Sequence, residues 1–182
     1  MEFPCVMPEL SREAKGQWRP MSVADLPAVR AIAEKVHPAF PEEAEVFAER
    51  LRLYAPGCLV FSSGEDIAGY VISHPWRAMD PPALNSRLGE IPGQPETYYI
   101  HDIALLRELH GTGAAALVVA LLLARAGREK LATASLVAVN DSVGFWERHG
   151  FRKITSDKIV DATLVRKLRG YGGAATFMVR QL

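Results

Sequence analysis

Residues 98–115, YYIHDIALLRELHGTGAA, join a long apolar run to a turn that contains two glycines. Between positions 98 and 106 the run is interrupted by His101 and Asp102, and the pattern is typical of a buried central strand. The residues after the turn predict a helix to about Ala126 that is apolar almost all round. Because such a helix must be covered on most sides, we expect it to pack against the sheet.

The turn between this strand and this helix is a candidate anion site. The first amides of a helix have no acceptors within it and carry the positive end of its dipole, so they can bind a phosphate or pyrophosphate. Gly111 and Gly113 lack Cβ atoms, which lets an anion approach the backbone, and Thr112 adds a hydroxyl. The same glycines also suit a tight turn without any ligand. The stretch matches neither GxxxxGK[ST] nor GxGxxG, since Ala116 fills the last position, so both of those phosphate motifs are excluded.

Outward from this stretch, hydrophobic periodicity predicts the remaining elements. Strands are expected at residues 17–20, 58–62, 67–73, 131–139, 151–154 and 174–181, and the second and third of these form a hairpin. Helices are expected after a cap at Ser22 and over residues 42–54, 110–126 and 140–149. Residues 75–96 hold five prolines and predict a long surface loop, and a basic, irregular connection precedes the last strand. The order indicates one α/β (α+β) domain, a mixed sheet with helices on its faces.

The composition of the 182 residues limits the class of function. The 21 Lys plus Arg balance 21 Asp plus Glu, which counts against a nucleic-acid partner and against docking on an acidic membrane. The longest apolar run, residues 114–124, is far shorter than the ~20 residues that cross a bilayer. Cys5 and Cys58 lack zinc-site or disulfide spacing, so we expect free thiols in a cytoplasmic protein. We expect a flexible leader at residues 1–16 and one domain over residues 17–182.

Two segments together resemble the GNAT superfamily of N-acetyltransferases. The first is the apolar strand with residues 110–115, HGTGAA, at a helix start, and the second is residues 140–151, NDSVGFWERHGF, after the next strand. Trp18, Arg19 and Pro20, followed by Asp25 and Leu26, are similar to the opening strand and first helix of the family. The resemblance covers residues 17–182 and implies a single-domain GNAT fold. Its sheet is mixed and mostly antiparallel, with a splayed central strand and helices on both faces.

The resemblance implies acetyl-CoA as the co-substrate and no metal. The pantetheine arm would pair with the backbone of the central strand, and the pyrophosphate would meet the amides of the glycine turn. A strand amide near Ile103 would polarise the thioester carbonyl. The residues that the resemblance assigns to cofactor binding are Ile103, Ala104, Leu105, His110, Gly111, Thr112, Gly113, Ala114, Ala115, Asn140, Phe145 and Trp146.

The same resemblance implies direct attack of a neutral amine on the thioester, so a base must remove a proton. His101 is the first candidate because an unperturbed imidazole titrates at about pH 6.5. Strand alternation places Tyr99 and Ile103 on the face of His101 and Asp102 on the other face, unless a bulge intervenes. Asp102 is an alternative base or a partner for a cationic amine, and Tyr99 completes the catalytic candidates. His74, which ends the preceding hairpin, is expected to be a wall or turn residue near the entrance of the acceptor site.

Two residues depart from the family pattern. His110 stands at a position that is usually basic or glutamine, which weakens the expected phosphate contact. Arg107 could compensate for this loss, although it is more simply explained as a solvated residue at the end of the strand. Trp146 stands where a tyrosine usually protonates the departing thiolate, and an indole N–H does not give up a proton near neutral pH. Either another group such as Tyr171 supplies that proton or the thiolate takes it from water.

The acceptor implied by the resemblance is a primary amine of a small molecule. An apolar or aromatic acceptor pocket is suggested by Trp76, Pro81, Pro82, Leu84 and Tyr99, although ordinary loop packing explains these residues as well. Two other hypotheses stay open: a non-catalytic acyl-CoA-binding sensor or interaction module, and a binder of a different nucleotide phosphate at the glycine turn. We expect the chain to act as a monomer or homodimer.

Overall fold

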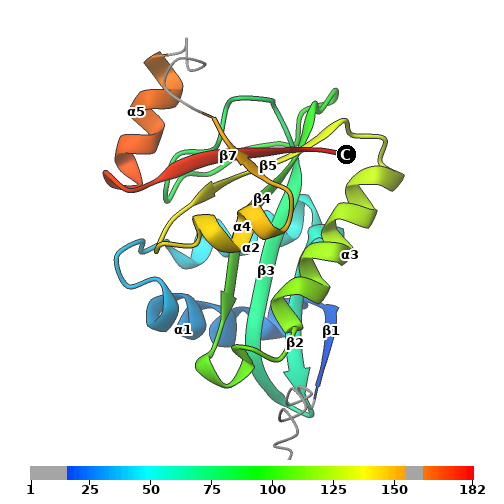
Figure 1. The fold of residues 1–182 in the computed structure, drawn as a ribbon. Coiled ribbons are helices and arrows are strands. Elements are labelled where there is room, and N and C mark those ends of the chain that lie inside the picture. Colours follow the sequence, from blue (N-terminus) through cyan, green and yellow to red (C-terminus); the bar gives the residue numbers. More distant parts are fainter. Residues whose placement is uncertain (1–15, 155–161) are drawn as a thin grey trace, which may run out of the picture.

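The structure is a computed structural model that describes residues 16–154 and 162–182 (Figure 1). Within these residues seven strands form one sheet in the order β1-β2-β3-β4-β5-β7-β6. Neighbouring strands are antiparallel except for the parallel pair β4 and β5. The strands are β1 (Gln17–Pro20), β2 (Cys58–Ser63), β3 (Asp66–Trp76), β4 (Thr97–Leu105), β5 (Thr133–Ala138), β6 (Arg152–Lys153) and β7 (Thr176–Gln181). The predicted mixed, mostly antiparallel sheet is confirmed.

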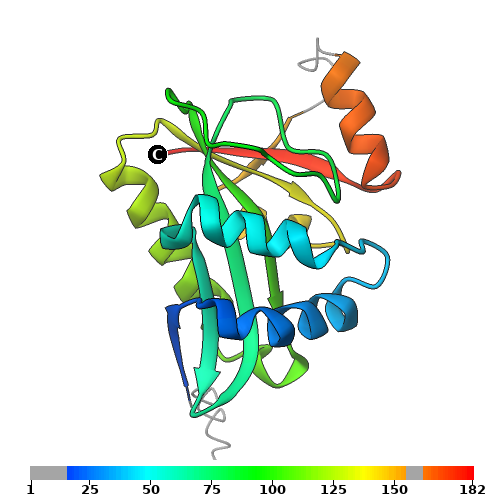
Figure 2. The ribbon, with the colours of Figure 1, turned by 180° about the vertical axis from the view of Figure 1, so that it is seen from behind.

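Helices cover both faces of this sheet. In Figure 1 α3 and α4 lie in front of the strands, and Figure 2 shows α1 and α2 against the opposite face. The helices are α1 (Leu26–Val36), α2 (Ala44–Leu53), α3 (Ala114–Arg128), α4 (Val143–Arg148) and α5 (Ala162–Gly170). Short 3-10 turns precede α1 (η1, Val23–Asp25), β2 (η2, Ala55–Gly57) and α3 (η3, Arg107–Leu109). The architecture is a three-layer arrangement with a helical layer on each side of the sheet.

Each helical layer closes its own apolar core. On one face Val118 and Leu122 of α3 pack with Leu136 of β5. On the other, Phe47 of α2 packs with Tyr70 of β3, and all five of these side chains are buried. Burial of this apolar area supplies most of the driving force for the fold, at roughly 25 cal/mol per Å². The sheet between the two cores is therefore held from both sides.

The outer side of α3 departs from expectation. Leu117 and Leu121 are 54% and 43% exposed, so the helix is covered on one side rather than on most sides by the described part of the chain. The helix contacts the sheet through Val118, Val119 and Leu122, which fall at helical spacing. Its nearly continuous apolar sequence therefore overstated how deeply it is buried.

A β-bulge interrupts the pairing of β3 with β4 at the centre of the sheet. Ile72 pairs with Asp102 but the next residue, Ser73, pairs with Ile100, so His101 is the extra residue. The expected side-chain alternation is therefore wrong beyond this point. Asp102 contacts groups on the same side as His101, among α1, α2 and β3, whereas Ile103 packs on the α3 side. The bulge brings the two polar residues of β4 to one face.

Strands β4 and β5 separate at the point where β4 bulges. They pair in parallel from Thr97 and Thr133 to Ile100 and Leu136, and no pairing between them continues beyond these residues in the described chain. The end of β5 stays paired with β7, while the end of β4 stays paired with β3. The predicted splay of the central strand is confirmed, and it leaves one edge of β4 facing the space between the strands.

Two elements differ from the predicted pattern. The connection before β7 contains α5, where Leu164 is buried but Arg166, Lys167 and Arg169 interrupt the apolar spacing. Strand β3 continues through Pro75 to Trp76 instead of ending at residue 73. Proline is tolerated there because β2 pairs with β3 only as far as Ile72, so its missing N–H faces no strand.

Other expectations fall partly outside the structure. Positions 1–15 of the expected leader, with Cys5, lie outside the described residues, while Cys58 is a buried free thiol. Ser22 is the N-cap of the 3-10 turn η1 that leads into α1, where its backbone N–H donates to the Asp25 carboxylate at 2.7 Å, whereas the N-cap of α1 itself is Asp25. In the two described ranges no helix is long and apolar enough to cross a membrane.

Candidate functional site

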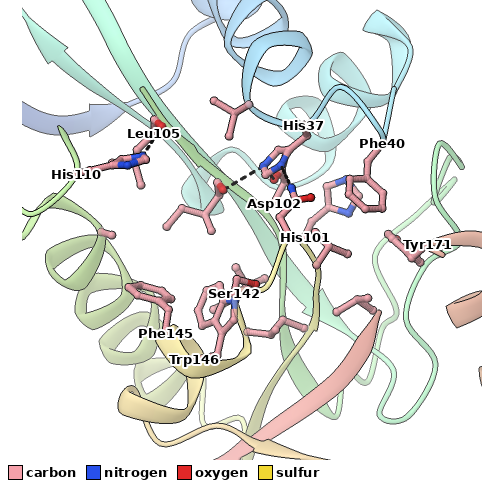
Figure 3. Close-up of a pocket in the computed structure, with 18 of the residues that line it drawn as sticks. His37, Phe40, His101, Asp102, Leu105, His110, Ser142, Phe145, Trp146 and Tyr171 are labelled. Carbon is pink, nitrogen blue, oxygen red and sulfur yellow. Dashed lines mark hydrogen bonds and ion pairs between the residues drawn. The ribbon is translucent and has the colours of Figure 1, made fainter. Parts of the chain in front are cut away.

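A cavity of about 530 Å³ occupies the space where β4 and β5 separate (Figure 3). Its walls come from β4, the end of β5, the glycine turn before α3, the start of α4 and the turn between α1 and α2. The lining residues are Val36, His37, Phe40, Glu42, Leu84, Ile100, His101, Asp102, Ile103, Leu105, Leu109, His110, Gly111, Gly113, Ala115, Leu136, Val137, Val139, Asn140, Ser142, Phe145, Trp146 and Tyr171. Most of these side chains are apolar, and the histidines and carboxylates lie at the two ends, His110 at one and His37, Glu42, His101 and Asp102 at the other.

The glycine turn forms one end of the cavity, here called the glycine end (residues 110–115). Gly111 and Gly113 have φ angles of +75° and +86°, a conformation that glycine adopts without strain, and Gly113 is the N-cap of α3. A Cβ built on either glycine would meet no atom within 4 Å, so the space beside the turn is open. The open backbone amides at a helix start have the chemistry that binds phosphate.

Three side chains near this turn are engaged elsewhere. The Thr112 hydroxyl donates to the Leu109 carbonyl at 2.7 Å, so it is not directed at an anion. The His110 ring contacts the Leu105 carbonyl through Nε2 at 3.2 Å, and Figure 3 shows it beside the strand edge. Ala114 is buried in a core cluster instead of lining the cavity, and its carbonyl accepts from the Trp18 indole. The turn thus offers backbone groups more than side chains.

The free edge of β4 forms the floor of the cavity. Ile103 and Leu105 line it, whereas Ala104 is buried in the core beneath α1 and α2. The Ile103 carbonyl faces the His37 Nε2 atom at 3.3 Å. An exposed strand edge of this kind pairs readily with an extended chain that carries amides. The Leu105 carbonyl likewise contacts His110 Nε2 at 3.2 Å, so both of these carbonyls already face an imidazole, and the pantetheine contacts of Ile103 and Leu105 stay a prediction.

The opposite wall comes from the turn and helix that follow β5. Asn140, Phe145 and Trp146, which the resemblance assigned to cofactor binding, all line the cavity. The Trp146 side chain is only 4% exposed and packs edge-on against Phe145 and Phe151. Asn140 has a left-handed backbone with φ +51°, which asparagine tolerates better than most residues. That conformation carries its amide toward the turn after α1.

The other end of the cavity, here called the histidine end (His37, Glu42, His101 and Asp102), carries two imidazole–carboxylate pairs. In the first pair His37 Nε2 lies 3.1 Å from Asp102 Oδ1, and the side chains are 15% and 17% exposed. Tyr70 donates its hydroxyl to the same carboxylate. Burial lowers the pKa of His37, but the hydrogen bond and charge of Asp102 outweigh it and raise that pKa above its ordinary value. Burial raises the pKa of Asp102, yet His37 and Tyr70 hold it below the ordinary value.

The second pair lies deeper at the same end. His101 Nε2 is 3.0 Å from Glu42 Oε2, and the two side chains are 2% and 6% exposed. Burial raises the pKa of Glu42, but the charge and hydrogen bond of His101 lower it overall. The other ring nitrogen of His101, Nδ1, is buried and makes no hydrogen bond in the described structure. Of these two pairs, this one is the less accessible.

Several predicted residues lie behind the cavity instead of in its wall. Tyr99 is 1% exposed and stacks near His101, with ring centroids 6.3 Å apart, and burial raises the pKa of Tyr99 well above its ordinary value. His74 lies against Trp76 and Tyr99, and burial lowers its pKa to about 3. Tyr171 does line the cavity, but its hydroxyl donates to the Pro82 carbonyl at 2.9 Å.

The predicted apolar acceptor pocket is present only in part. Leu84 lines the cavity, while Trp76 and Tyr99 belong to a core cluster with Leu164 of α5. Phe40, which the sequence did not single out, supplies an aromatic side chain to the cavity wall (Figure 3).

Sequence analysis missed His37 and Glu42, because both lie in the turn between α1 and α2, far along the chain from β4. The signal available was a histidine at the end of a predicted helix, directly before Pro38. A helix that stops at His-Pro places that imidazole at a fixed point beside the next element. Among the described residues no group of three or more His, Cys, Asp or Glu side chains is placed to hold a metal ion.

Comparisons with known proteins bear on this arrangement. The profile of the Acetyltransferase (GNAT) family matches residues 24–151. No curated protein matches the sequence. Among solved structures, the fold is similar to Ard1 from Thermoplasma volcanium, with TM-score 0.67, 13% identity, and coverage of 93% of this chain and 99% of that one.

Two further structures share the fold at comparably low identity. A GNAT-like decarboxylase, GphF, in complex with isobutyryl-CoA has a TM-score of 0.72 at 16% identity and covers 91% of this chain and 98% of its own. The ribosomal-protein-S18-alanine N-acetyltransferase from Escherichia coli has a TM-score of 0.59 at 15% identity. The match covers 91% of this chain and 93% of that one. At such identities these likenesses establish the fold alone.

Proposed function

Because the chain belongs to the Acetyltransferase (GNAT) family, it is an acyltransferase, and we propose that it moves an acetyl group from acetyl-CoA to a primary amine of a small molecule. The observation that carries this proposal is the cavity itself. One continuous space joins a glycine turn suited to pyrophosphate with the free edge of β4 and then with two imidazole–carboxylate pairs. An anionic co-substrate and a cationic acceptor would thus enter from opposite ends.

The residues present fit the co-substrate. Backbone amides around Gly113 would hold the pyrophosphate, because the space beside the turn is open and they lie at the positive end of the α3 dipole. The Ala114 N–H, which donates to Thr112 Oγ1 at 3.4 Å, would have to exchange that hydrogen bond for the ligand. The backbone of Ile103 and Leu105 would pair with the pantetheine amides, and Phe145 would cover the arm from the α4 side. The co-substrate, when bound, supplies an activated thioester. A strand amide near Ile103 would then face its carbonyl oxygen, an oxyanion-type role.

The acceptor would bind at the histidine end. Asp102 and Glu42 give this end its negative charge, which attracts an ammonium group before it loses a proton. Phe40 and Leu84 give it apolar walls, which suit an amine on an aliphatic or aromatic carrier. One of the two imidazoles takes the proton, and His101 is the residue that sequence reasoning favoured. The cavity volume of about 530 Å³ lies in the range of small-molecule sites.

The test is release of free CoA thiol from acetyl-CoA by purified protein across a panel of primary amines. We expect turnover with at least one amine whose carrier is aliphatic or aromatic. The matched control is the tertiary analogue of each active amine, which binds the same carboxylates but cannot form an amide. Equal thiol release with the tertiary analogue would mean simple thioester hydrolysis, and the proposed transfer would be wrong.

One observation favours a second candidate function, a non-catalytic acyl-CoA-binding module. Trp146 is buried where the family usually offers a tyrosine hydroxyl, and the Tyr171 hydroxyl is committed to Pro82, so neither group is poised to protonate a thiolate. Calorimetric binding of acetyl-CoA without turnover on any amine would support this alternative. Turnover in which the thiolate takes its proton from water would exclude it.

A further inference from the structure

We infer that His37, and not His101, takes the proton from the attacking amine, and that Asp102 is the positioning residue that holds His37 for this role. The inference rests on the proposed transfer to an amine and identifies the residue that acts as its base. It follows from the turn between α1 and α2, which brings His37 against the bulge of β4 (Figure 3). Sequence analysis did not single out this imidazole.

The hydrogen bonds of His37 select one tautomer. Its Nε2 atom lies 3.1 Å from Asp102 Oδ1 and 3.3 Å from the Ile103 carbonyl, and both of these oxygens are acceptors, so Nε2 carries the hydrogen. Its Nδ1 atom lies 3.0 Å from Asn140 Nδ2, which is a donor, so Nδ1 presents its lone pair. A partly buried carboxylate on one ring nitrogen, and on the other a lone pair held only by the Asn140 side-chain amide, is the arrangement of a general base once that amide is displaced.

The position of that lone pair favours His37 over His101. His37 and Asn140 both line the cavity, and Asn140 belongs to the wall that faces the β4 edge. An amine that displaces the Asn140 amide would meet Nδ1 on the cavity side of the His37 ring, while Nε2 of the same ring stays beside the Ile103 carbonyl. His101 instead has one nitrogen bound to Glu42 and the other buried without solvent access, in a side chain that is 2% exposed. A substrate reaches His37 without rearranging the sheet.

The bulge explains why Asp102 can serve this role. Without the extra residue at His101, Asp102 would point toward α3 and away from the turn after α1. With it, the carboxylate lies between His37 and the hydroxyl of Tyr70, both of which donate to it. Two donors on one partly buried carboxylate keep it ionised and fixed in place. The irregularity in β4 therefore has a chemical consequence.

The ammonium group of the acceptor first loses one proton to solvent and reacts as the neutral amine. Its nitrogen then bonds to the acyl carbon, the C–S bond breaks with its electron pair on sulfur, and the second proton, shed by nitrogen in this step, moves to Nδ1 of His37. The Asp102 carboxylate stabilises the imidazolium that results, and the proton then passes to water. Because the free base is the active form, kcat should rise with pH through the pKa of His37, which Asp102 raises above its ordinary value despite burial.

The charged and titratable groups around this pair come from every neighbouring element. Asp102 and His101 belong to β4, Tyr70 to β3, and Glu42 precedes α2. Glu42 raises the pKa of His37 by its charge, though less than Asp102 does. Removing the Asp102 charge should therefore move the acidic limb of the rate profile to lower pH.

The experiment measures kcat against pH for the wild-type protein, H37Q, D102N and H101Q with one active amine. H37Q is expected to lose roughly 100-fold in kcat at neutral pH and to lose the acidic limb. D102N should keep an acidic limb in its kcat–pH profile, shifted to lower pH. H101Q should keep the acidic limb at the wild-type position, even if its kcat is lower. The matched control is H149Q, because His149 lies outside the cavity wall, and its profile should equal that of wild type. An unchanged limb in H37Q together with a lost limb in H101Q would overturn the inference.

A second readout needs neither acetyl-CoA nor turnover. In protein with ¹⁵N-labelled histidine, the His37 ring signal, assigned by its absence in H37Q, should show a pKa above its ordinary value and should titrate at lower pH in D102N than in wild type. An unchanged titration in D102N would overturn the role of Asp102. A wild-type protein without turnover overturns the proposed transfer and the base assignment together. An active wild type with an equally active H37Q overturns the base assignment alone.

Discussion

The two ends of the cavity are built in opposite ways. The glycine end consists of consecutive residues, and its donors are backbone amides whose placement depends on two positive φ angles. The histidine end draws side chains from the turn after α1, the start of α2 and the bulge of β4. Its groups are charged and largely buried, while the glycine end is open and uncharged. One end is local in sequence and the other exists only in the folded protein.

This contrast indicates where the stability of each end comes from. Backbone amides at a helix start cost little to arrange because the helix itself orients them. Buried charges cost free energy unless every partner is present. The histidine end is therefore surrounded by further ion pairs and hydrogen bonds that hold its loops. Glu42, for example, accepts from the Asn85 backbone as well as from His101.

The largest expected effect on stability comes from Arg50, which holds the loop behind the histidine end. Its guanidinium is 1% exposed and donates to Glu49 at 2.9 Å and to the Ser86 carbonyl at 2.7 Å. Glu49 in turn accepts from the Leu88 and Gly89 backbones. We expect Arg50→Met to lower the free energy of unfolding by about 3 kcal/mol, because it leaves a buried carboxylate unpaired. Urea denaturation measures this change.

The matched control for that substitution is Arg30→Met. Arg30 pairs with Glu34 at 2.9 Å on the surface of α1, where both side chains are more than half exposed. An exposed pair of this kind contributes only about 0.5 kcal/mol. If the two variants lose the same stability, the histidine end is not held by buried charge and the contrast between the two ends disappears.

The next effect in size concerns the glycine end. Gly113→Ala adds a Cβ to a residue at φ +86° and places it in the open space beside the amides of α3. We expect acetyl-CoA affinity to fall roughly 30-fold, since about two charge-assisted hydrogen bonds are weakened. Isothermal titration calorimetry measures this directly.

Gly64→Ala separates backbone strain from ligand contact. Gly64 also has a positive φ, +65°, and also faces open space, but it lies in the β2–β3 hairpin turn. Both substitutions should cost about 1 kcal/mol of stability. Only Gly113→Ala should weaken acetyl-CoA binding. Comparable loss of affinity in both variants would mean that the glycine turn does not contact the co-substrate.

The difference between a local glycine end and a non-local histidine end also explains which features could be predicted from the sequence. The strand, the glycine turn and α3 follow from consecutive residues, and the predicted order of strands and of α1 to α4 is confirmed. Ile103, Gly113 and Phe145, which the family resemblance assigned to the cofactor, do line the cavity. The predictions that the structure overturned concern features that depend on pairing between distant segments. The bulge at His101 arises from the register of β3 against β4, and no residue type in β4 announces it.

Two other features that were not predicted, helix α5 and the site residue His37, have similar causes. Helix α5 has one buried residue, Leu164, so the apolar period that identifies helices is too weak there, and its arginines and lysine suggested a solvated connection. His37 became a site residue only because α1 ends beside β4, which depends on the packing of α1 against the sheet. A lone histidine before a proline carries no sign of its distant partner.

The smallest expected effect is a pH dependence of stability at the histidine end. The pKa of His37 is raised on folding, so its pair stabilises the protein below its ordinary value near 6.5 and loses this contribution as pH rises through the folded value. The pKa of Asp102 is lowered, so its contribution is present above the ordinary value near 3.8 and is lost as pH falls through the folded value. The pair therefore contributes most between these two ordinary values.

We expect wild type to exceed D102N in free energy of unfolding by on the order of 1 kcal/mol near pH ~5.5, and by less near pH ~8. Asn keeps the shape of Asp102 and can still accept from Tyr70, so the difference reports the charge. His74, whose pKa burial lowers to about 3, makes both proteins less stable in acid and cancels in the difference. Asp66→Asn, at an exposed hairpin position, should show no such peak. A difference that grows steadily from pH ~5.5 to pH ~8 would mean that His37 and Asp102 are not an ion pair, and the histidine end would then resemble the uncharged glycine end.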